Sequence, residues 1–379
     1  MPKLPNRQEL NMIKPIAFYL PQFHPIPEND KWWGKGFTEW TNVAKATPLY
    51  KGHWQPRLPA DLGFYDLRVA ESRLAQADLA KQYGIDGFAY WHYWFGEGKR
   101  LLERPFQEML SSGQPEFPFC LAWANQTWSG TWHGLSNKQI LIEQQYPGIQ
   151  DHTDHFYCLL PAFQDKRYIE VNGKKLFLLF RALDIPDLDA FINLWQELAL
   201  KEGIGGFHFV AIHEKEEILE KHPLNGIVQE QPYINLLQKK INLVDKIAFQ
   251  VLKTTYTEYQ RKKKKIPVQA FYDKYVDSYP QSHIGEKQYP LIYPDWDNTP
   301  RSGADGWKFE NSHPDLFYNL CLKAFAETAN KALGEKLVFI KSWNEWAEGN
   351  YLEPDRKWGH AYLEAFKNAL ADYNSKQIR

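Results

Sequence analysis

Two glutamates near the end of the chain have the types and spacing that acid–base chemistry needs. Glu345 and Glu348 stand three residues apart in the segment 343–349, Trp-Asn-Glu-Trp-Ala-Glu-Gly. On one helical turn, the Cβ atoms of such a pair lie about 5–6 Å apart. Retaining glycosidases hold two carboxyl groups about 5–5.5 Å apart, so the pair suits cleavage of a glycosidic bond. A helix N-terminus explains the same spacing without catalysis, because the helix dipole favours glutamate there.

Aromatic side chains are unusually frequent and indicate a ligand class. They make up 16% of the 379 residues, with 15 Trp and 21 Tyr. Trp and Tyr need hydrogen-bond partners when buried, so they are demanding core residues. Many lie in predicted loops, where their faces could stack on sugar rings. The formal net charge of −1 gives no overall attraction to nucleic acid or to an anionic membrane, and no nucleic-acid partner is expected.

Strand-like segments alternate with helical patterns along the chain, which predicts an α/β fold with a parallel sheet closed into one (β/α)8 TIM barrel. The predicted strands are 13–20, 84–91, 117–123, 175–180, 206–212, 226–229, 289–293 and 337–340. The predicted helices are 66–83, 99–111, 151–166, 187–201, 214–221, 315–331 and 360–373. The clearest helix is 66–83, whose apolar stripe ends at Gly84.

The chain is longer than a minimal barrel of about 250 residues. The surplus falls in two predicted loop insertions, 21–65 and 232–288, and 1–12 is predicted to be an N-terminal extension. Because no composition break marks a second domain, residues 1–379 are expected to form one catalytic domain. The basic run 261–265 is most simply a solvated surface, with a polyanion or membrane contact as the alternative.

Polar and aromatic residues follow six of the eight predicted strands, where barrel enzymes carry their active sites. The predicted substrate-binding residues are Tyr19, Glu39, Trp40, His92, Trp94, Trp123, Asn125, Asp295, Trp296 and Asn344. Three of the tryptophans are expected to be sugar platforms: Trp40, Trp94 and Trp123. Four residues are expected to hydrogen-bond sugar hydroxyls: Glu39, His92, Asn125 and Asp295. The segment 229–231 after the sixth strand belongs to the same group. Each could singly be a core residue, but their shared position favours a site.

Two segments, 187–189 and 295–297, match the Asp-x-Asp pattern with which metal-dependent glycosyltransferases hold a nucleotide-sugar diphosphate. The pattern is short enough to arise by chance, and the first copy sits at a predicted helix start, where Asp is common. The sequence has no dinucleotide fingerprint, P-loop or zincin motif, so no cofactor and no metal is expected.

Cysteine usage and hydropathy bear on where the protein works. The three cysteines (Cys120, Cys158 and Cys321) lack metal-ligand spacing and fit a reducing compartment. The sequence shows no apolar signal core near residue 1 and no run of 18 apolar residues, so no integral membrane segment is expected. A cytoplasmic location is the expectation.

Several sequence blocks together resemble the WbsX-type proteins, which are encoded with bacterial surface-polysaccharide genes and are similar to glycoside hydrolase family 99. The blocks are 18–24, 36–43, 55–56, 61–68 and 343–349. The resemblance covers nearly the whole chain and implies a (β/α)8 barrel and carbohydrate chemistry. Family 99 enzymes are retaining endo-α-mannosidases with two glutamates in a matching segment. By this resemblance, Glu348 would be the general acid/base. Glu345 would deprotonate the sugar 2-hydroxyl, which attacks C1 to give a 1,2-anhydro intermediate.

The resemblance therefore predicts a retaining glycoside hydrolase that acts on bacterial surface polysaccharide or a related glycan. The first alternative is a glycosyltransferase of O-antigen, lipopolysaccharide or capsule biosynthesis, because some WbsX-type proteins carry that label. The second alternative is a non-catalytic sugar-binding barrel. A glycosyltransferase would require a nucleotide sugar and a divalent metal and would lose activity in Asp295→Ala, whereas a hydrolase would require neither.

Overall fold

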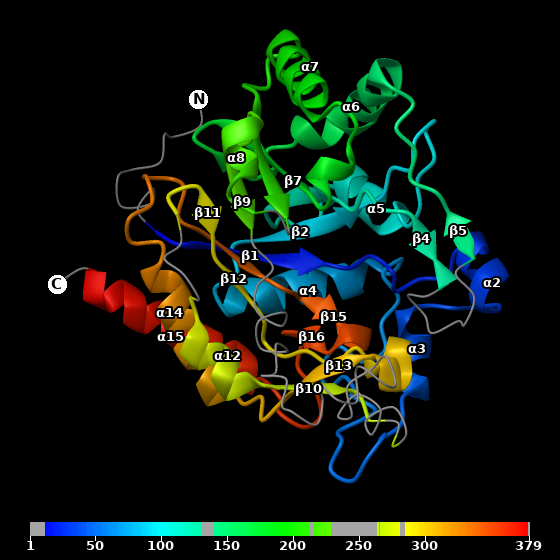
Figure 1. The fold of residues 1–379 in the computed structure, drawn as a ribbon, viewed down its shortest axis with the longest axis vertical. Helices are drawn as coiled ribbons and strands as arrows, with labels where there is room; N and C mark the ends of the chain where they lie inside the picture. The colour runs from blue at the N-terminus through cyan, green and yellow to red at the C-terminus, as the bar shows by residue number, and fades with distance from the viewer. Residues whose placement is uncertain are drawn as a thin grey trace, which may run out of the picture.

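The computed structural model describes residues 12–130, 139–212, 215–228, 264, 266–280 and 285–377. In that part of the chain, nine parallel strands form a nearly closed barrel surrounded by helices (Figure 1). In chain order the strands are β1 (Lys14–Tyr19), β2 (Gly87–His92), β3 (Phe119–Trp123), β7 (Lys174–Leu179), β8 (Phe207–Ile212), β9 (Gly226–Val228), β11 (Gln288–Tyr289), β12 (Leu291–Ile292) and β14 (Leu337–Ile340). The predicted (β/α)8 architecture is confirmed.

A proline divides the seventh wall segment, which the sequence predicts as one strand, 289–293. β11 pairs with β9, whereas β12 pairs with β14, so this one segment contributes both ends of the nearly closed wall. Pro290 separates the two halves and has no N–H group to give to a strand ladder. Its carbonyl oxygen still accepts a hydrogen bond from the Phe339 amide at 2.9 Å. Eight wall positions thus hold nine strands.

Side chains alternate between the inside of the barrel and the surrounding helices, because successive residues of a strand face opposite ways. Phe18 faces inward and stacks on Trp91 and Phe339, with ring centroids 4.8 and 5.9 Å away. Its neighbour Tyr19 faces outward, and its hydroxyl donates to Gln76 Oε1 at 2.7 Å. This alternation decides which residues can reach the barrel mouth.

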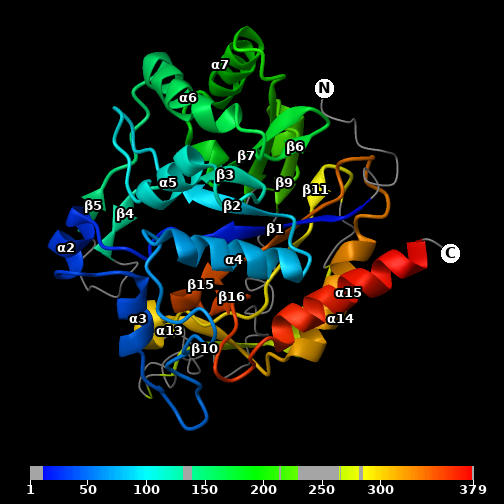
Figure 2. The same cartoon turned by 180° about the vertical axis from the view of Figure 1, so that it is seen from behind.

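The predicted helices are present, with ends shifted by a few residues, and they cover the outside of the wall (Figures 1 and 2). They are α4 (Ala70–Gln82), α5 (Arg104–Ser112), α6 (Ile149–Phe163), α7 (Leu188–Lys201), α8 (Ile218–Lys221), α14 (Pro314–Ala326) and α15 (Ala361–Gln377). α6 packs beside α7, and α14 packs beside α15 (Figures 1 and 2). Among the described helices, none has the length and apolar character needed to cross a lipid bilayer.

The two predicted insertions contain secondary structure of their own. Residues 21–65 include α2 (Pro27–Trp33) and α3 (Glu39–Lys45). The described end of 232–288 contains β10 (Val268–Phe271) and α12 (Tyr272–Ser278), and β10 pairs with β13 (Trp307–Glu310). The predicted site segment 229–231, and all of the basic run 261–265 except Lys264, lie outside the described residues.

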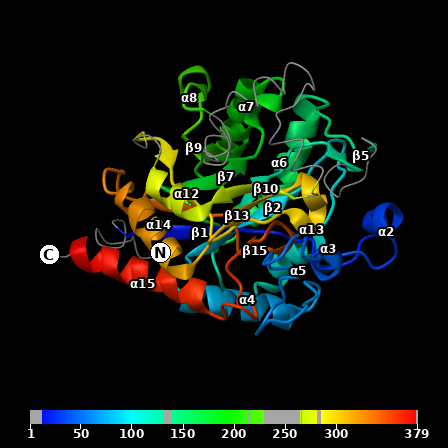
Figure 3. The same ribbon diagram turned by 60° about the horizontal axis from the view of Figure 1, so that its bottom comes forward.

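The segment 343–349 forms a hairpin and contains no α-helix, which corrects the helical-turn expectation. β15 (Asn344–Glu345) pairs antiparallel with β16 (Asn350–Tyr351), and the 3-10 turn η4 (Trp346–Glu348) joins them. Because no α-helix begins there, a helix dipole cannot account for the two glutamates. The turn contacts α3 and α13 (Thr299–Ser302), which lie beside the hairpin (Figure 3).

Candidate active site

Backbone and amide hydrogen bonds fix the base of the glutamate hairpin to the first wall strand. The Trp343 amide donates to the Phe18 carbonyl at 2.8 Å, and the Leu352 amide donates to the Trp343 carbonyl at 2.9 Å. Asn344 Oδ1 accepts from the Leu20 amide at 2.7 Å, and its Nδ2 donates to the Leu20 carbonyl at 3.1 Å. Asn344, a predicted substrate contact, therefore joins β15 of the hairpin to the residue that follows β1.

One arginine contacts three carboxylates at the mouth of the barrel. Arg301 Nη1 lies 2.6 Å from Glu348 Oε1, and its Nη2 lies 2.7 Å from Glu345 Oε1. Its Nε lies 2.9 Å from Glu39 Oε1. The Glu39 side chain is fully buried and that of Arg301 is 11% exposed. Arg301 comes from α13 and the glutamates from α3, β15 and η4, so four separate elements build the cluster.

The environment of Glu345 shifts its pKa toward neutrality. Burial, followed by the negative charges of Glu348 and Glu39, raises the pKa of Glu345, which is about 7 when all its neighbours are included. The positive charges of Arg301 and Lys341 oppose it. A carboxyl group with a pKa near the working pH can both accept and release a proton, as general acid–base catalysis requires.

Besides Arg301, two neighbours of the carboxylates, Tyr93 and Lys341, are absent from the predicted substrate-binding residues, as is Trp91 on the inner face of the wall. Trp91 is half-buried and faces into the barrel against Phe18. Burial raises the pKa of the Tyr93 hydroxyl, and the charge of Glu345 raises it further, which places that ring beside the cluster. Lys341 Nζ lies 5.2 Å from the Trp296 ring centroid and acts on the Glu345 charge.

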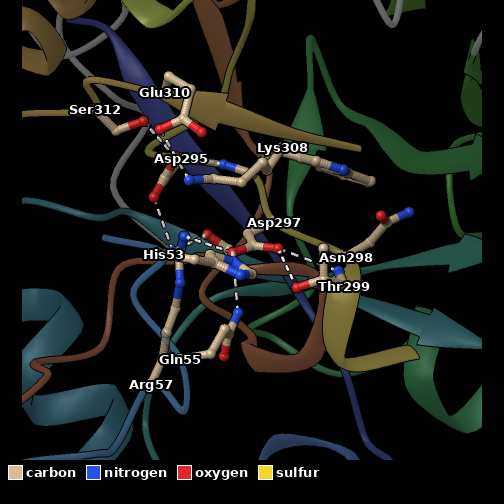
Figure 4. Close-up of polar contacts among 12 residues, drawn as sticks. His53, Gln55, Arg57, Asp295, Asp297, Asn298, Thr299, Lys308, Glu310 and Ser312 are labelled. Carbon is tan, nitrogen blue, oxygen red and sulfur yellow. Dashed lines mark hydrogen bonds and ion pairs between the residues drawn. The ribbon is translucent and has the colours of Figure 1, made fainter. Parts of the chain in front are cut away.

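The Asp-x-Asp segment 295–297 forms an internal network (Figure 4). Asp297 is fully buried; His53 Nε2 lies 2.9 Å and Gln55 Nε2 lies 3.0 Å from its Oδ2. The Thr299 hydroxyl donates to its Oδ1 at 2.6 Å. Burial alone would raise the pKa of Asp297, but His53, Arg57 and Thr299 hold it well below its usual range. Both oxygens are thus occupied by protein donors, which is the environment of a structural anchor.

Arg57, which lies beside Asp295 in Figure 4, connects this network to the glutamate hairpin. Its Nη1 lies 2.8 Å from Asp295 Oδ2 and 3.0 Å from the Gly349 carbonyl oxygen. Asp295 also accepts from the Ser312 hydroxyl and from the Trp296 amide. Across the described residues, no three acidic, histidine or cysteine side chains gather as a bound metal ion would need.

Comparisons with known proteins identify the family. The sequence profile described as "Glycosyltransferase WbsX" matches residues 15–366. The chain belongs to the WbsX family. Two curated relatives, both named "Uncharacterized protein WxcX", come from two strains of Xanthomonas campestris pv. campestris and are 34% identical to this chain over 365 residues. The alignments cover 94% of this chain and 49% of each relative, so the chain spans about half their length.

Solved structures share the fold of this WbsX-family chain. One, described as "Glycoside hydrolase-like protein", aligns with a TM-score of 0.57 at 14% identity and covers 98% of this chain and 97% of its own. Another, the GH99 endo-alpha-mannosidase from Bacteroides thetaiotaomicron with bound BIS-TRIS-propane, aligns with a TM-score of 0.56 at 14% identity and 96% and 98% coverage. At this identity the likeness establishes a common barrel fold.

Three predicted sugar contacts of the WbsX-family chain face the helices. His92 Nε2 lies 2.8 Å from His155 Nε2, and burial lowers the pKa of His92 to about 3, so its ring is neutral. Trp94 Nε1 donates to Asp151 at 3.0 Å, and Trp123 Nε1 donates to the Trp94 carbonyl at 3.0 Å. These contacts join the wall to α6, so we leave the three residues out of the proposed substrate site.

Tyr19 and Asn125 also have internal partners in the WbsX-family chain. The Tyr19 hydroxyl faces α4. Asn125 is fully buried; its Nδ2 donates to the Arg181 carbonyl at 2.8 Å and its Oδ1 accepts from the Arg181 amide at 2.9 Å. The same Nδ2 donates to the Tyr146 hydroxyl at 2.8 Å. Asn125 therefore joins the loops that follow β3 and β7, and neither residue is carried into the proposed substrate site.

Trp40 supports the turn of the glutamate hairpin instead of presenting an open face. Its Nε1 donates to the Tyr65 carbonyl at 2.8 Å, and its ring packs on Trp346 with centroids 5.5 Å apart. Trp346 in turn donates to Glu353 Oε2 at 2.6 Å, and Glu353 Oε1 accepts from Gln76 at 2.6 Å. Burial raises the pKa of Glu353 to about 7. Trp40 is therefore a packing residue behind the site.

Gly349 is required where the hairpin turns, and its replacement should destabilise the protein. Its φ is +65°, and an added Cβ would lie 2.7 Å from the Asp297 amide nitrogen and 3.0 Å from Arg57 Nη1. That amide donates to the Glu348 carbonyl at 2.7 Å, so the peptide cannot move freely. Gly359 is a matched control, because its φ is +54° and nothing lies within 4 Å of its added Cβ.

We expect Gly359→Ala to cost about 1–2 kcal/mol, the usual penalty for a left-handed Cβ. Gly349→Ala should cost about 1–3 kcal/mol more because of the steric conflict. Urea unfolding of the two variants beside the parent protein measures the difference. Equal losses in the two variants would contradict the tight contact at Gly349.

Proposed function

We propose that this chain is a retaining glycoside hydrolase, similar in mechanism to endo-α-mannosidases, that acts on bacterial surface polysaccharide or a related glycan. The observation that carries the proposal is the buried pair Glu345 and Glu348, held at the C-terminal mouth of the barrel by two nitrogens of one guanidinium group. Membership of the WbsX family and the barrel shared with glycoside hydrolases support carbohydrate chemistry.

The two carboxylates divide the reaction between them. Glu345 takes the proton of the sugar 2-hydroxyl while O2 attacks C1 and the bond from C1 to the leaving oxygen breaks. Glu348 gives its proton to that oxygen. In the second step Glu348 takes a proton from water while the water oxygen attacks C1, the C1–O2 bond breaks, and O2 recovers its proton from Glu345. C1 is inverted twice, so the product keeps the starting configuration. The pKa of Glu345 near 7 suits a general base at neutral pH.

The charge of the site favours a neutral sugar over a nucleotide sugar. Three carboxylates surround the single guanidinium of Arg301, so the cluster tends to repel the diphosphate of a nucleotide sugar. The oxygens of Asp297 are already bound by His53, Gln55 and Thr299. A glycosyltransferase remains the second candidate, because the description of the family names that activity.

Product analysis tests the proposal. The protein is incubated with bacterial surface polysaccharides and mannose-containing oligosaccharides in EDTA, without a nucleotide sugar. The hydrolase should release new reducing ends, and NMR early in the reaction should show the anomer with retained configuration. Turnover that requires both a nucleotide sugar and a divalent metal would overturn the proposal in favour of transfer. Glycan binding without turnover of any substrate would favour a sugar-binding barrel.

The pH dependence of the reaction should follow Glu345. As the base for the 2-hydroxyl, Glu345 must be ionised, and its pKa is raised to about 7. The value of kcat/KM should therefore rise with pH through about 7 and fall about tenfold for each unit below it. Steady-state rates between pH 5 and 9 measure this limb. Activity that increases as the pH falls below 7 would assign the protonated form, and hence the acid role, to Glu345.

A further inference from the structure

Arg301 binds only one carboxylate oxygen of each of the two glutamates. The contacts of Arg301 are with Oε1 of Glu345 and Oε1 of Glu348. Oε2 of Glu348 lies 3.4 Å from Asn350 Nδ2, a long contact, and Oε2 of Glu345 has no hydrogen-bond partner among the described residues. Neither Oε2 atom is bound by Arg301, so in the proposed reaction these are the oxygens that serve the sugar hydroxyl and the leaving oxygen.

The guanidinium group is suited to holding two carboxylates in register. Its nitrogens lie in one rigid plane, so two oxygens bound to Nη1 and Nη2 have a fixed separation and direction. A lysine ammonium has the same charge but rotates freely and cannot impose this geometry. Arg301 therefore supplies orientation as well as charge.

Arg301 is itself steered by Glu39. Its Nε donates to Glu39 Oε1 at 2.9 Å, which leaves the two terminal nitrogens for the hairpin. Glu39 also contacts Gln22 Nε2 at 3.4 Å and Asn42 Nδ2 at 3.5 Å, and its own amide donates to the Gln22 carbonyl at 2.9 Å. A fully buried carboxylate with these partners is fixed in place and cannot move to contact a substrate. Its contact with Nε therefore orients the arginine.

We propose that Glu39 and Arg301 are positioning residues that orient Glu345 and Glu348, Arg301 directly and Glu39 through Arg301. This inference rests on the proposed hydrolase function and changes the predicted role of Glu39 from binding a sugar hydroxyl to holding Arg301. The two residues lie 262 positions apart and come from the loops after β1 and β12, so folding assembles the site only when both loops are in place.

The two positioning residues act on Glu345 with opposite charge, which gives a test that a merely structural role would not satisfy. Arg301 lowers and Glu39 raises the pKa of Glu345, whose main shift comes from burial. Removing the charge of Arg301 should move the acid limb of kcat/KM to higher pH. Removing the charge of Glu39 with the isosteric Glu39→Gln, which still accepts from Nε, should move it to lower pH.

The experiment compares Arg301→Lys, Arg301→Met and Glu39→Gln with the parent protein on the substrate found in the glycan screen. Arg301→Lys should lower kcat on the order of 10²-fold with KM changed little, because charge remains but orientation is lost. If Arg301→Met fails to fold, Arg301→Lys still tests the orienting role, and Glu39→Gln still tests the shift of the acid limb of kcat/KM. The control is Arg104→Lys on α5, an exposed arginine paired with Glu108 at 2.6 Å, which should leave kcat unchanged.

Each outcome separates the two proposals. Opposite shifts of the acid limb and a selective loss of kcat in Arg301→Lys support the positioning role. The positioning role alone is overturned if the parent protein is active, folded Glu39→Gln keeps the acid limb of kcat/KM at the same pH, and Arg301→Lys keeps its kcat. A parent protein that turns over no glycan overturns the proposed function and this inference with it.

Discussion

Replacing Glu348 by glutamine should lower kcat by about 10²–10⁴-fold, the usual contribution of a general acid or base. Glutamine has the size of glutamate and can accept from Arg301 through its carbonyl oxygen, so the hairpin keeps its shape. It can neither give a proton to the leaving oxygen nor take one from water. Steady-state rates of the variant measure the loss. Glu364→Gln on the exposed face of α15 is the control and should retain full activity.

The chemistry of the leaving group separates the roles of the two glutamates. An aryl glycoside with an acidic phenol needs little protonation to depart, so Glu348→Gln should recover much of its first-step rate on that substrate. Glu345→Gln should show no such recovery of its first-step rate, because the 2-hydroxyl must still lose its proton. Recovery of Glu345→Gln instead of Glu348→Gln would reverse the assignment.

Asp297→Asn should destabilise the protein by about 3–5 kcal/mol, the range for breaking a buried charge pair. Asp297 is fully buried and accepts from His53, Gln55 and Thr299, with Arg57 Nη2 at 3.6 Å. The Nδ2 amide group of asparagine would point its two N–H donors at neighbours that are themselves donors. The positive charge of Arg57 would also lose part of the negative charge that balances it. Urea unfolding at pH 7 measures the change.

The loss should depend on pH in a definite direction. The folded-state pKa of Asp297 is lowered, so its stabilisation is present above the unfolded-state pKa, about 4, and disappears as the pH falls further. The difference between Asp297→Asn and the parent protein should therefore shrink in acid. Glu116→Gln is the matched control, since its ion pair with Lys166 is mostly exposed and should leave the unfolding midpoint unchanged. A large loss that persists unchanged at low pH would contradict the charge argument.

The wall of the barrel could be predicted because its strands are apolar runs with sharp ends. β14 was predicted at its observed bounds, since Lys336 and Lys341 enclose four apolar residues. The division of the seventh segment could not be predicted from the apolar pattern, because Pro290 lies within a run that reads as one strand. Pairing with two different neighbours depends on barrel closure, which is a property of the whole chain.

The prediction of the site was limited more by the direction in which side chains face than by their residue types. In 91–94, Trp-His-Tyr-Trp, both faces of the strand carry aromatic rings with polar atoms, so composition does not reveal the inner face. The structure turns Trp91 toward Phe18 inside the barrel and brings Tyr93 near Glu345. It turns His92 and Trp94 toward α6. Strand alternation could have paired Trp91 with Tyr93, but choosing between the pairs needed the register with β1.

Arg301 could not be predicted for a different reason. It lies in a four-residue helix within a loop, outside any motif, and its partners are 44 to 262 positions away. The sequence shows the carboxylates, whose spacing is local, but gives no sign of the cation that joins them. Long-range compensation of this kind appears only when separate loops are brought together.

The divided seventh wall segment is also where the strand ladders of the barrel wall are short. β11 and β12 contribute two residues each, so short ladders hold the wall at that point, and short ladders open with less free energy than long ones. The chain runs from β12 directly into the segment that carries Asp297 and Arg301. We therefore expect any opening of the wall there to reach the segment that carries Arg301, because no other wall strand lies between them. If the proposed roles of Glu345 and Glu348 hold, substitutions that strengthen the pairing of β11 and β12 should alter turnover without changing any residue at the mouth of the barrel.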